Sequence, residues 1–224
     1  GIRDTSVTGV QTCALPIWLK FNPRAPVVDK LSRLLPFRLT AAQDQVIREI
    51  YRDMISPRPM NRLVQGDVGS GKTVVGLHAI VMACGSGYQA ALMAPTEILA
   101  EQHYRNLKGT LEALGLNVAL LRGSDKAAVK KAQAAQLASG EVQVAIGTHA
   151  LIQKGVAFKN LGLAVVDEQH KFGVMQRKNL IDKGYRPDVL VLTATPIPRT
   201  LAMTVYGDLD VSVIDMLQIG RAHV

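Results

Sequence analysis

Short apolar runs alternate with longer amphipathic stretches over residues 40–194 of the chain. The runs that have the length and composition of strands are "RLVQG", "AALMA", "NVALL", "VQVAIG", "LGLAVVD" and "VLVLTA". Strands that are apolar on both faces and are separated by helices predict an α/β fold, with a mainly parallel sheet covered by helices on both faces. Ligands of such sheets bind beyond the carboxyl ends of the strands, so the chemistry is expected at that edge.

The stretches between the strands have the spacing of helices. Residues 40–54, "TAAQDQVIREIYRDM", begin with Thr40, a favourable N-cap, and have one apolar side, formed by Val46, Ile47, Ile50 and Tyr51. Further helices are expected to begin near Gly71, Glu97, Lys126 and Thr148. The helix from Glu97 is expected to end at Gly115, since glycine is the usual residue just after a helix.

The two ends of the chain do not follow this pattern. The last residues, "IGRAHV", can be encoded by DNA whose reverse complement, read in frame, encodes "TCALPI" at residues 12–17. An inverted match of this kind resembles translated sequencing-adapter DNA, so residues 1–17 and 218–224 are expected to be foreign to the fold. Residues 18–36 are expected to be a linker or the tail of a missing N-terminal domain, which leaves residues 37–217 as one domain.

Composition narrows the class of protein only slightly. The chain has 224 residues, 48% of them hydrophobic, which is enough for the core of one α/β domain. Its formal net charge of +8 fits a polyanionic partner without proving one. The apolar runs are much shorter than the roughly 20 residues that span a bilayer. Outside the foreign ends Cys84 is the one cysteine, so neither a disulfide nor a cysteine metal site is expected, and a reducing cytoplasm is the default location.

The most informative motif is a phosphate-binding loop. Residues 66–73, "GDVGSGKT", fit G-x-x-x-x-G-K-[ST] between a predicted strand and a predicted helix. Glycines let backbone N–H groups curl around a phosphate, and the start of the helix adds partial positive charge. We expect the nucleotide to be bound by Gly66, Gly69, Ser70, Gly71, Lys72 and Thr73, with Lys72 at the β- and γ-phosphates and the Thr73 hydroxyl on Mg²⁺.

A second motif lies where the strand "LAVVD" ends, at Asp167 and Glu168. A phosphate-bound Mg²⁺ needs an oxygen ligand opposite the lysine, and Asp167 can supply it. Glu168 would then orient and deprotonate the attacking water as the general base. The alternative is a solvated acidic turn. Together the two motifs predict catalytic roles for Lys72, Asp167 and Glu168, and ATP with Mg²⁺ as the cofactors.

A longer set of motifs resembles a known family. In order along the chain they are "PFRLTAAQ", "GDVGSGKT", "APTEILAEQH", "IGTHALIQ", "DEQH" and "TATPIPRTLAMT". The set resembles the first RecA-like motor domain of superfamily 2 helicases. More narrowly, "DEQHKFGVMQR" and "TATPIPRTLAMTVYGDLDVSVID" are similar to the RecG family of bacterial ATP-dependent helicases, which remodel branched DNA. The resemblance covers about residues 35–216.

The resemblance implies roles that the residues alone did not. Phe37 and Gln43 match the motif that reads adenine, by stacking and by an amide contact. Thr193 and Thr195 match the motif that couples the nucleotide to DNA, with Gln169 and His170 as their partners. Five residues fall in or beside segments that track a nucleic-acid backbone: Thr96, Glu97, Gly123, Gly147 and Thr148. Thr96 and Thr148 could equally be helix N-caps.

The remaining charged and histidine residues point to no site from the sequence. His78 and His103 are expected to be ordinary helix residues, and His149 stays undecided. A cluster on one helix, Lys126, Lys130 and Lys131, is expected to be a solvated face.

The resemblance implies an ATP-dependent DNA helicase that acts on forks and junctions in DNA repair and recombination. Such a motor needs a second RecA-like domain and an N-terminal junction-binding domain, which this sequence lacks, so we expect weak ATPase and no unwinding from the chain alone. Two alternatives stay open: the motor domain of a transcription-repair coupling translocase, and a nucleotide-dependent DNA-binding module without catalysis. A helicase of the same class acting on RNA is disfavoured by the "YGDLDVSVID" tail.

Overall fold

The computed structural model describes residues 19–167, 179–195 and 209–215. Glu168, Gln169 and His170, and both ends expected to be foreign, lie outside these residues. The strands are β1 (Asn61–Gly66), β2 (Gln89–Met93), β3 (Val118–Leu121), β4 (Val144–Gly147), β5 (Leu161–Asp167), β6 (Asp188–Thr193) and β7 (Asp210–Ile214). The helices are α1 (Pro26–Leu34), α2 (Ala41–Met54), α3 (Lys72–Gly85), α4 (Glu97–Ala113), α5 (Ala127–Ser139) and the 3₁₀ helix η1 (His149–Ile152).

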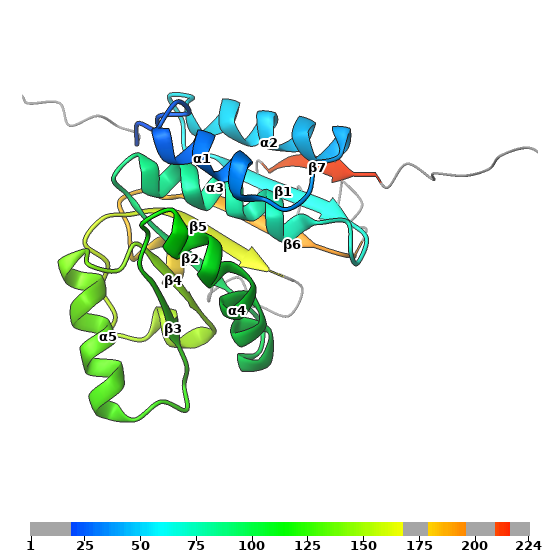
Figure 1. Ribbon diagram of the computed structural model, residues 1–224. Helices are drawn as coiled ribbons and strands as arrows, with labels where there is room; N and C mark the ends of the chain where they lie inside the picture. The colour runs from blue at the N-terminus through cyan, green and yellow to red at the C-terminus, as the bar shows by residue number, and fades with distance from the viewer. Residues whose placement is uncertain (1–18, 168–178, 196–208, 216–224) are drawn as a thin grey trace, which may run out of the picture.

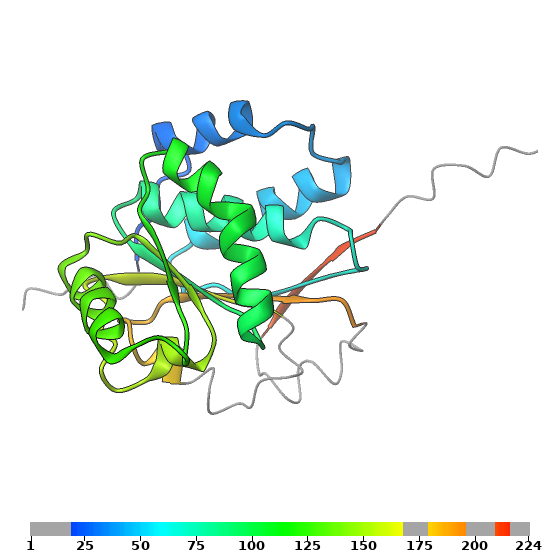
Figure 2. The same cartoon turned by 60° about the horizontal axis from the view of Figure 1, so that its bottom comes forward.

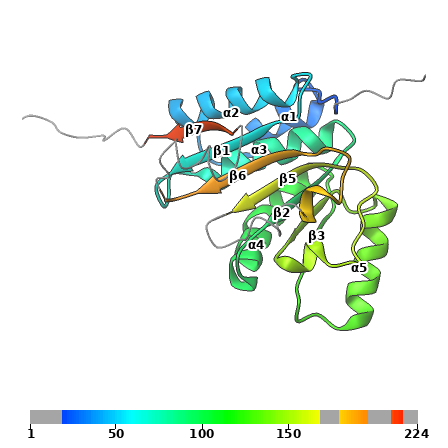
Figure 3. The ribbon, with the colours of Figure 1, turned by 180° about the vertical axis from the view of Figure 1, so that it is seen from behind.

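The strands form one sheet in the order β3-β4-β2-β5-β6-β1-β7. Every described pair of neighbours is parallel, which confirms the predicted fold class. Figures 1 and 3 show the sheet from its two sides, with β7, β1, β6 and β5 side by side at one end. Four of the interior strands, β2, β4, β5 and β6, are buried along their whole length, as expected for a parallel sheet covered on both faces.

Helices cover the two faces of the sheet with separate cores. Figure 2 shows α1, α3 and α4 on one side and η1 on the other. Alternate strand residues face the two sides: on β5, Leu163 and Val165 join the core under α3, whereas Ala164 and Val166 join the core that includes η1 and the α5 residue Leu137. This alternation is the period-two pattern of a strand.

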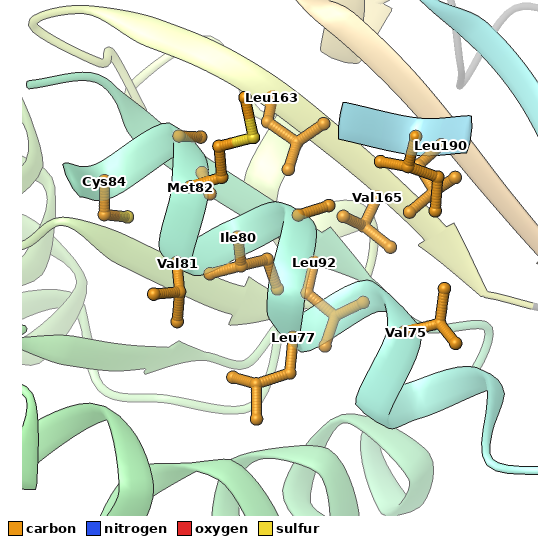
Figure 4. Packing of buried hydrophobic residues seen from close by; sticks show 14 of the residues in the cluster. Val75, Leu77, Ile80, Val81, Met82, Cys84, Leu92, Leu163, Val165 and Leu190 are labelled. Carbon is orange, nitrogen blue, oxygen red and sulfur yellow. The ribbon is translucent and has the colours of Figure 1, made fainter. Parts of the chain in front are cut away.

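Helix α3 is the centre of the larger core. Its residues from Val75 to Cys84 are all buried. Figure 4 shows Ile80 and Val75 against the strand residues Leu92 and Val165, which lie beneath the helix. Because the helix that follows the phosphate loop is packed on every side, its first residues are held firmly relative to the sheet.

Two helices begin at side-chain caps that the sequence indicated. The Thr40 hydroxyl accepts from the Gln43 N–H at 3.2 Å, and the Gln43 side chain accepts from the Thr40 N–H at 3.0 Å, a complete capping box. Thr96 accepts from the Leu99 N–H at 3.3 Å at the start of α4. The N-cap prediction for Thr40 is confirmed. Of the two threonines for which an N-cap was an alternative to a DNA contact, Thr96 caps its helix, whereas Thr148 precedes η1 without a side-chain cap bond.

The structure differs from the sequence analysis at three elements. Helix α1 lies within the segment expected to be a linker or tail, and its buried residues Val28 and Leu31 pack in the core with α3. Its domain assignment stays a prediction. Strand β7 was not predicted, and the helix expected near Thr148 is only the one-turn η1.

No helix in the described ranges is long and apolar enough to cross a membrane.

Candidate nucleotide and DNA site

The two predicted nucleotide motifs lie at the same edge of the sheet. In the pairing of β5, β6 and β1, Asp167 lies opposite Leu192, and Leu192 lies opposite Val64. Asp167 is therefore level with the strand residues that lead into the phosphate loop and is separated from them by one strand. At about 4.8 Å per strand, this places the end of β5 about 10 Å from β1.

The loop conformation depends on glycine at defined positions. Gly69 and Gly71 have φ of 85° and 83°, in the left-handed region that disfavours other residues. A Cβ atom on Gly71 would collide with the Gln43 side-chain nitrogen, and one on Gly66 would lie 2.6 Å from Ser70 Oγ. The glycines therefore let the loop pack closely upon itself and upon α2.

The Lys72 side chain folds back onto the loop that precedes α3. Its Nζ donates to the carbonyl oxygens of Gly66 and Asp67 at 2.7 and 2.8 Å. The ammonium therefore lies beside the loop backbone at the start of α3, where a helix adds partial positive charge. This placement fits the expected role of Lys72 at the phosphates of a nucleotide.

A cleft of about 560 Å³ opens beside the loop. Its wall includes two loop glycines and Thr73, together with Phe37, Gln43 and residues of α4. Phe37 is 53% exposed, so its ring is accessible to a ligand. Phe37 and Gln43 thus line the same cleft as the phosphate loop, and their role in reading adenine stays a prediction.

Gln43 also connects the cleft to the phosphate loop. Its Nε2 donates to the Ser70 carbonyl at 2.8 Å, while its Oε1 accepts from the Thr40 N–H. A side-chain amide has two N–H donors and two lone pairs, so each end keeps one position for a base edge. The residue can therefore position the loop and contact a ligand at the same time.

Asp167 is nine-tenths buried at the end of β5 and has a histidine partner. Nε2 of His103, on α4, lies 2.7 Å from Oδ2 of Asp167. Carboxylate oxygens only accept hydrogen bonds, so the ring nitrogen is the donor. His103 was expected to be an ordinary helix residue; it lies buried in α4 as expected, and the structure adds a contact between its ring and Asp167, a predicted metal ligand.

Thr193 ends β6 between the two motifs. Its hydroxyl lies 2.9 Å from the Thr195 hydroxyl and accepts from the Thr195 N–H at 3.2 Å. Thr193 is fully buried, whereas Thr195 is exposed. The pair therefore shapes the turn that leaves β6 beside Asp167. Its predicted partners Gln169 and His170 lie outside the described residues, so the coupling role stays a prediction.

Residues predicted to track DNA gather at the other half of this edge, where β2, β3 and β4 end. The Glu97 carboxylate accepts from the Ser124 N–H at 3.2 Å and from the Ser124 hydroxyl at 2.8 Å. These bonds lower the pKa of Glu97, and the bond from the Ser124 hydroxyl has the largest effect. A Cβ on Gly123 would lie 3.2 Å from Glu97 Oε1 and 3.6 Å from the ring of His149, so the loop after β3 meets the starts of α4 and η1.

Ion pairs hold the same loop. Arg122 contacts Asp125 and Glu101, each at 2.9 Å, and these carboxylates raise the pKa of the Arg122 guanidinium. Lys130 Nζ donates to the Gly123 carbonyl at 2.6 Å, so this lysine is not simply solvated. The segment 122–125 is thus fixed to α4 on one side and to α5 on the other.

Two of the predicted DNA residues, Gly147 and Thr148, lie at buried positions. A Cβ on Gly147 would lie 2.5 Å from the Leu121 carbonyl, so glycine is needed where β3 and β4 come together. Thr148 is buried, and its hydroxyl has no hydrogen-bond partner among the described residues. Neither observation tests DNA contact, which stays a prediction for all five residues.

The donor set at the nucleotide half fits Mg²⁺. Thr73 offers a hydroxyl and Asp167 a carboxylate, and oxygen ligands of this kind are what Mg²⁺ prefers. No group of three or more His, Cys, Asp or Glu that could hold a metal occurs in residues 19–167, 179–195 and 209–215. A site with few protein ligands is usual for Mg²⁺ on a nucleotide, because phosphate and water supply the other oxygens.

Helix α4 supplies side chains that the sequence analysis missed. Asn106 and Thr110 line the cleft, and His103 contacts Asp167. These three positions follow one another at intervals of three and four, which places them along one side of a helix. A polar stripe beside the buried stripe of α4 was therefore the available signal, although polar helix positions are most often simply solvated.

A phosphate loop between β1 and α3, on a parallel sheet with helices on both faces, defines a RecA-like P-loop domain. The chain belongs to the DEAD/DEAH box helicase family, whose profile matches residues 40–204. Two solved structures of Mss116, at 18% identity and TM-scores of 0.66 and 0.64, share the fold.

Relatives with higher identity bear the name "ATP-dependent DNA helicase RecG". The chain is 59% identical to that of Synechocystis over 90% of its own length and 24% of the relative's. It is 58% identical to that of Bacillus subtilis, covering 85% of this chain and 28% of the relative. A structure of RecG bound to a three-way DNA junction matches at 47% identity and a TM-score of 0.75, over 93% of this chain and 28% of that one. The chain thus spans about a quarter of the length of these relatives.

Proposed function

We propose that this chain is the first, ATP-binding motor domain of a helicase that acts on branched DNA in repair and recombination. The observation that carries the proposal is the position of the phosphate loop and Asp167 at one edge of the sheet, with the single strand β6 between β1 and β5. The similarity to RecG, including a structure bound to a three-way junction, supports DNA forks and junctions as the substrate.

In this proposal the loop and the cleft bind ATP. Backbone N–H groups of residues 66–73 and the start of α3 surround the phosphates, and Lys72 neutralises charge on the β- and γ-phosphates. Phe37 stacks on the adenine, and Gln43 contacts its edge. Since Gln43 is bonded to Ser70 O, occupation of the base site would also steady the phosphate loop.

Thr73 and Asp167 are the residues that would hold Mg²⁺, which supplies charge neutralisation at the β- and γ-phosphate oxygens when bound. Glu168 follows Asp167 directly and is the proposed general base for the attacking water. Thr193 and Thr195, with Gln169 and His170, would relay the state of this site to DNA. The backbone of the DNA would lie across the ends of β2, β3 and β4, near Thr96, Gly123 and Thr148.

A second RecA-like domain and a junction-binding domain are the partners that we propose for this domain. In related phosphoryl-transfer enzymes an added arginine accelerates the reaction by ~10³–10⁵. We therefore expect the 224-residue chain alone to bind ATP weakly, to hydrolyse it slowly and not to unwind DNA. Strong DNA-stimulated ATPase activity of this chain alone would contradict the need for a second domain.

The test of the nucleotide site is Lys72→Ala, measured by titration with a fluorescent ATP analogue. We expect binding to be abolished, because the variant loses the ammonium at the loop while the fold is kept. Lys131→Ala, which removes an exposed lysine of α5, is the matched control and should bind like the parent chain. Unchanged binding by Lys72→Ala would overturn the proposal.

A second candidate function is a nucleotide-dependent DNA-binding module without catalysis. The ion pairs that order segment 122–125 independently of the phosphate loop favour it. DNA affinity that survives in Lys72→Ala, together with no measurable ATPase in the parent chain, would select this function. The motor domain of a coupling translocase is less supported, because the relatives with high identity are named RecG.

A further inference from the structure

Two described histidines are buried in helices, and they differ in what they contact. His78, on α3, bonds through Nδ1 to the Val74 carbonyl of its own helix, and its Nε2 has no partner in the described part of the chain. Burial lowers the pKa of His78, as expected for a neutral core residue. His103 instead reaches out of α4 to a carboxylate 64 residues away in the sequence. Packing alone accounts for His78 but leaves the contact of His103 unexplained.

The geometry of the His103 contact fixes one oxygen of Asp167. The Nε2–Oδ2 distance is 2.7 Å, and both side chains are about nine-tenths buried. A carboxylate held by a hydrogen bond to one oxygen cannot rotate freely, so its second oxygen keeps one direction. Hydrogen bonds to ligating carboxylates commonly orient metal ligands in this way.

Helix α4 carries further contact residues on both sides of His103. Six residues before His103, Glu97 bonds to Ser124 at the candidate DNA edge, and one to two turns after it Asn106 and Thr110 line the nucleotide cleft. At 1.5 Å per residue, about 9 Å of helix separates Glu97 from His103. One rigid helix therefore contacts the DNA edge, Asp167 and the nucleotide cleft.

We propose that His103 is a positioning residue for the metal site: it holds the Asp167 carboxylate in the orientation that meets Mg²⁺ on a bound nucleotide. Through α4 the same contact ties the metal site to segment 122–125, so a shift of α4 on DNA binding reaches Asp167 directly. This inference rests on the proposed function, because it needs Asp167 as a metal ligand.

The test compares His103→Leu, which keeps the volume and loses the donor, with His103→Gln, whose amide nitrogen can reach the position of Nε2. Binding of a fluorescent non-hydrolysable ATP analogue is titrated with Mg²⁺ and, separately, in EDTA. For His103→Leu we expect the Mg²⁺ concentration at half-maximal effect to rise about 10–100-fold, with unchanged affinity in EDTA. His103→Gln should recover most of the loss, and His78→Leu should leave the Mg²⁺ dependence unchanged.

The remaining outcomes separate this inference from the proposed function. If Lys72→Ala abolishes binding while His103→Leu keeps the parent Mg²⁺ dependence, the role of His103 is overturned and the proposed function stands. If Lys72→Ala binds normally, the proposed function fails first. Should His103→Leu not fold, as judged by its thermal melt, His103→Asn replaces it, since the shorter side chain keeps polarity and loses reach. Equal Mg²⁺ dependence in His103→Asn and His103→Gln would overturn the inference.

Discussion

Asp167 and Asp188 lie on neighbouring strands, β5 and β6, at opposite edges of the sheet. Both are buried, and both accept a hydrogen bond through one oxygen: Asp167 from His103, and Asp188 from the Met60 N–H at 2.8 Å. The second oxygen of Asp188 is buried without a partner among the described residues. Burial and, to a smaller extent, the nearby Asp53 raise the pKa of Asp188 to about 8.

The difference between Asp167 and Asp188 shows that the position of an aspartate in the fold decides its role. At the amino end of β6, Asp188 accepts a hydrogen bond from the Met60 N–H, and burial raises its pKa to about 8, which favours the protonated form. At the carboxyl end of β5, Asp167 shares an edge with the phosphate loop and with Thr193. Ligand sites of parallel sheets form at this second edge, because loops and helix starts converge there.

The largest expected effect is on Asp167. Asp167→Asn keeps the size of the side chain and removes its negative charge, so Mg²⁺-dependent tightening of ATP binding should fall on the order of 100-fold or more, beyond the effect of losing an outer-shell partner. Asp188→Asn should leave the Mg²⁺ dependence of ATP binding unchanged. The measurement is the Mg²⁺ titration of nucleotide binding. Equal behaviour of the two variants would remove the functional distinction between the two edges.

The second effect concerns stability. A raised pKa in the folded state contributes stability below the unfolded value of 3.8, and this contribution is lost as pH rises through about 8. Asp188→Asn mimics the protonated form. The difference between its free energy of unfolding and that of the parent chain should therefore shift in favour of the variant as pH rises. The full slope of about 1.4 kcal/mol per pH unit sets an upper limit of roughly 4 kcal/mol between pH 5 and 8. Urea melts at these two pH values measure the difference, and a difference that does not change with pH would refute this account.

The strands and the phosphate loop could be predicted well from the sequence. Six of the seven strands in the described ranges and the loop at Gly71 follow from short-range signals, namely apolar runs and glycines at fixed spacing. Helix α1 was missed because Pro23 and Pro26 suggested a linker, although Pro26 occupies the first helical position, where proline is tolerated. Strand β7 is short and half exposed at the edge of the sheet, so its pattern is weak.

The contacts between distant side chains could not be predicted. The His103–Asp167 pair depends on how α4 packs against β5, and the Glu97–Ser124 pair on where the loop after β3 lies. Neither follows from residue type or local spacing. The role of Gln43 is intermediate: family resemblance placed it at the base, and the structure adds its bond to the Ser70 carbonyl.

The smallest effect is expected at a partly exposed carboxylate, Glu97. Its pKa is lowered in the fold, so its contribution to stability is present above the unfolded value of 4.5 and is lost as pH falls. At pH 7 Glu97→Gln should change the urea midpoint little, since exposed ion pairs and hydrogen bonds stabilise weakly. The variant should bind forked DNA a few-fold more tightly at low salt, because a negative charge beside the proposed phosphate path is removed.

The control for this measurement is Glu112→Gln, near the other end of the same helix and paired with Lys108 at 3.7 Å. Its DNA affinity should match the parent chain, which separates a local effect at Glu97 from a change in net charge. A tenfold weaker complex with Glu97→Gln would contradict the expected repulsion and would assign Glu97 a direct contact with DNA. In that case the carboxylate that orders Ser124 would also belong to the binding surface, and charge would matter at both halves of the carboxyl edge.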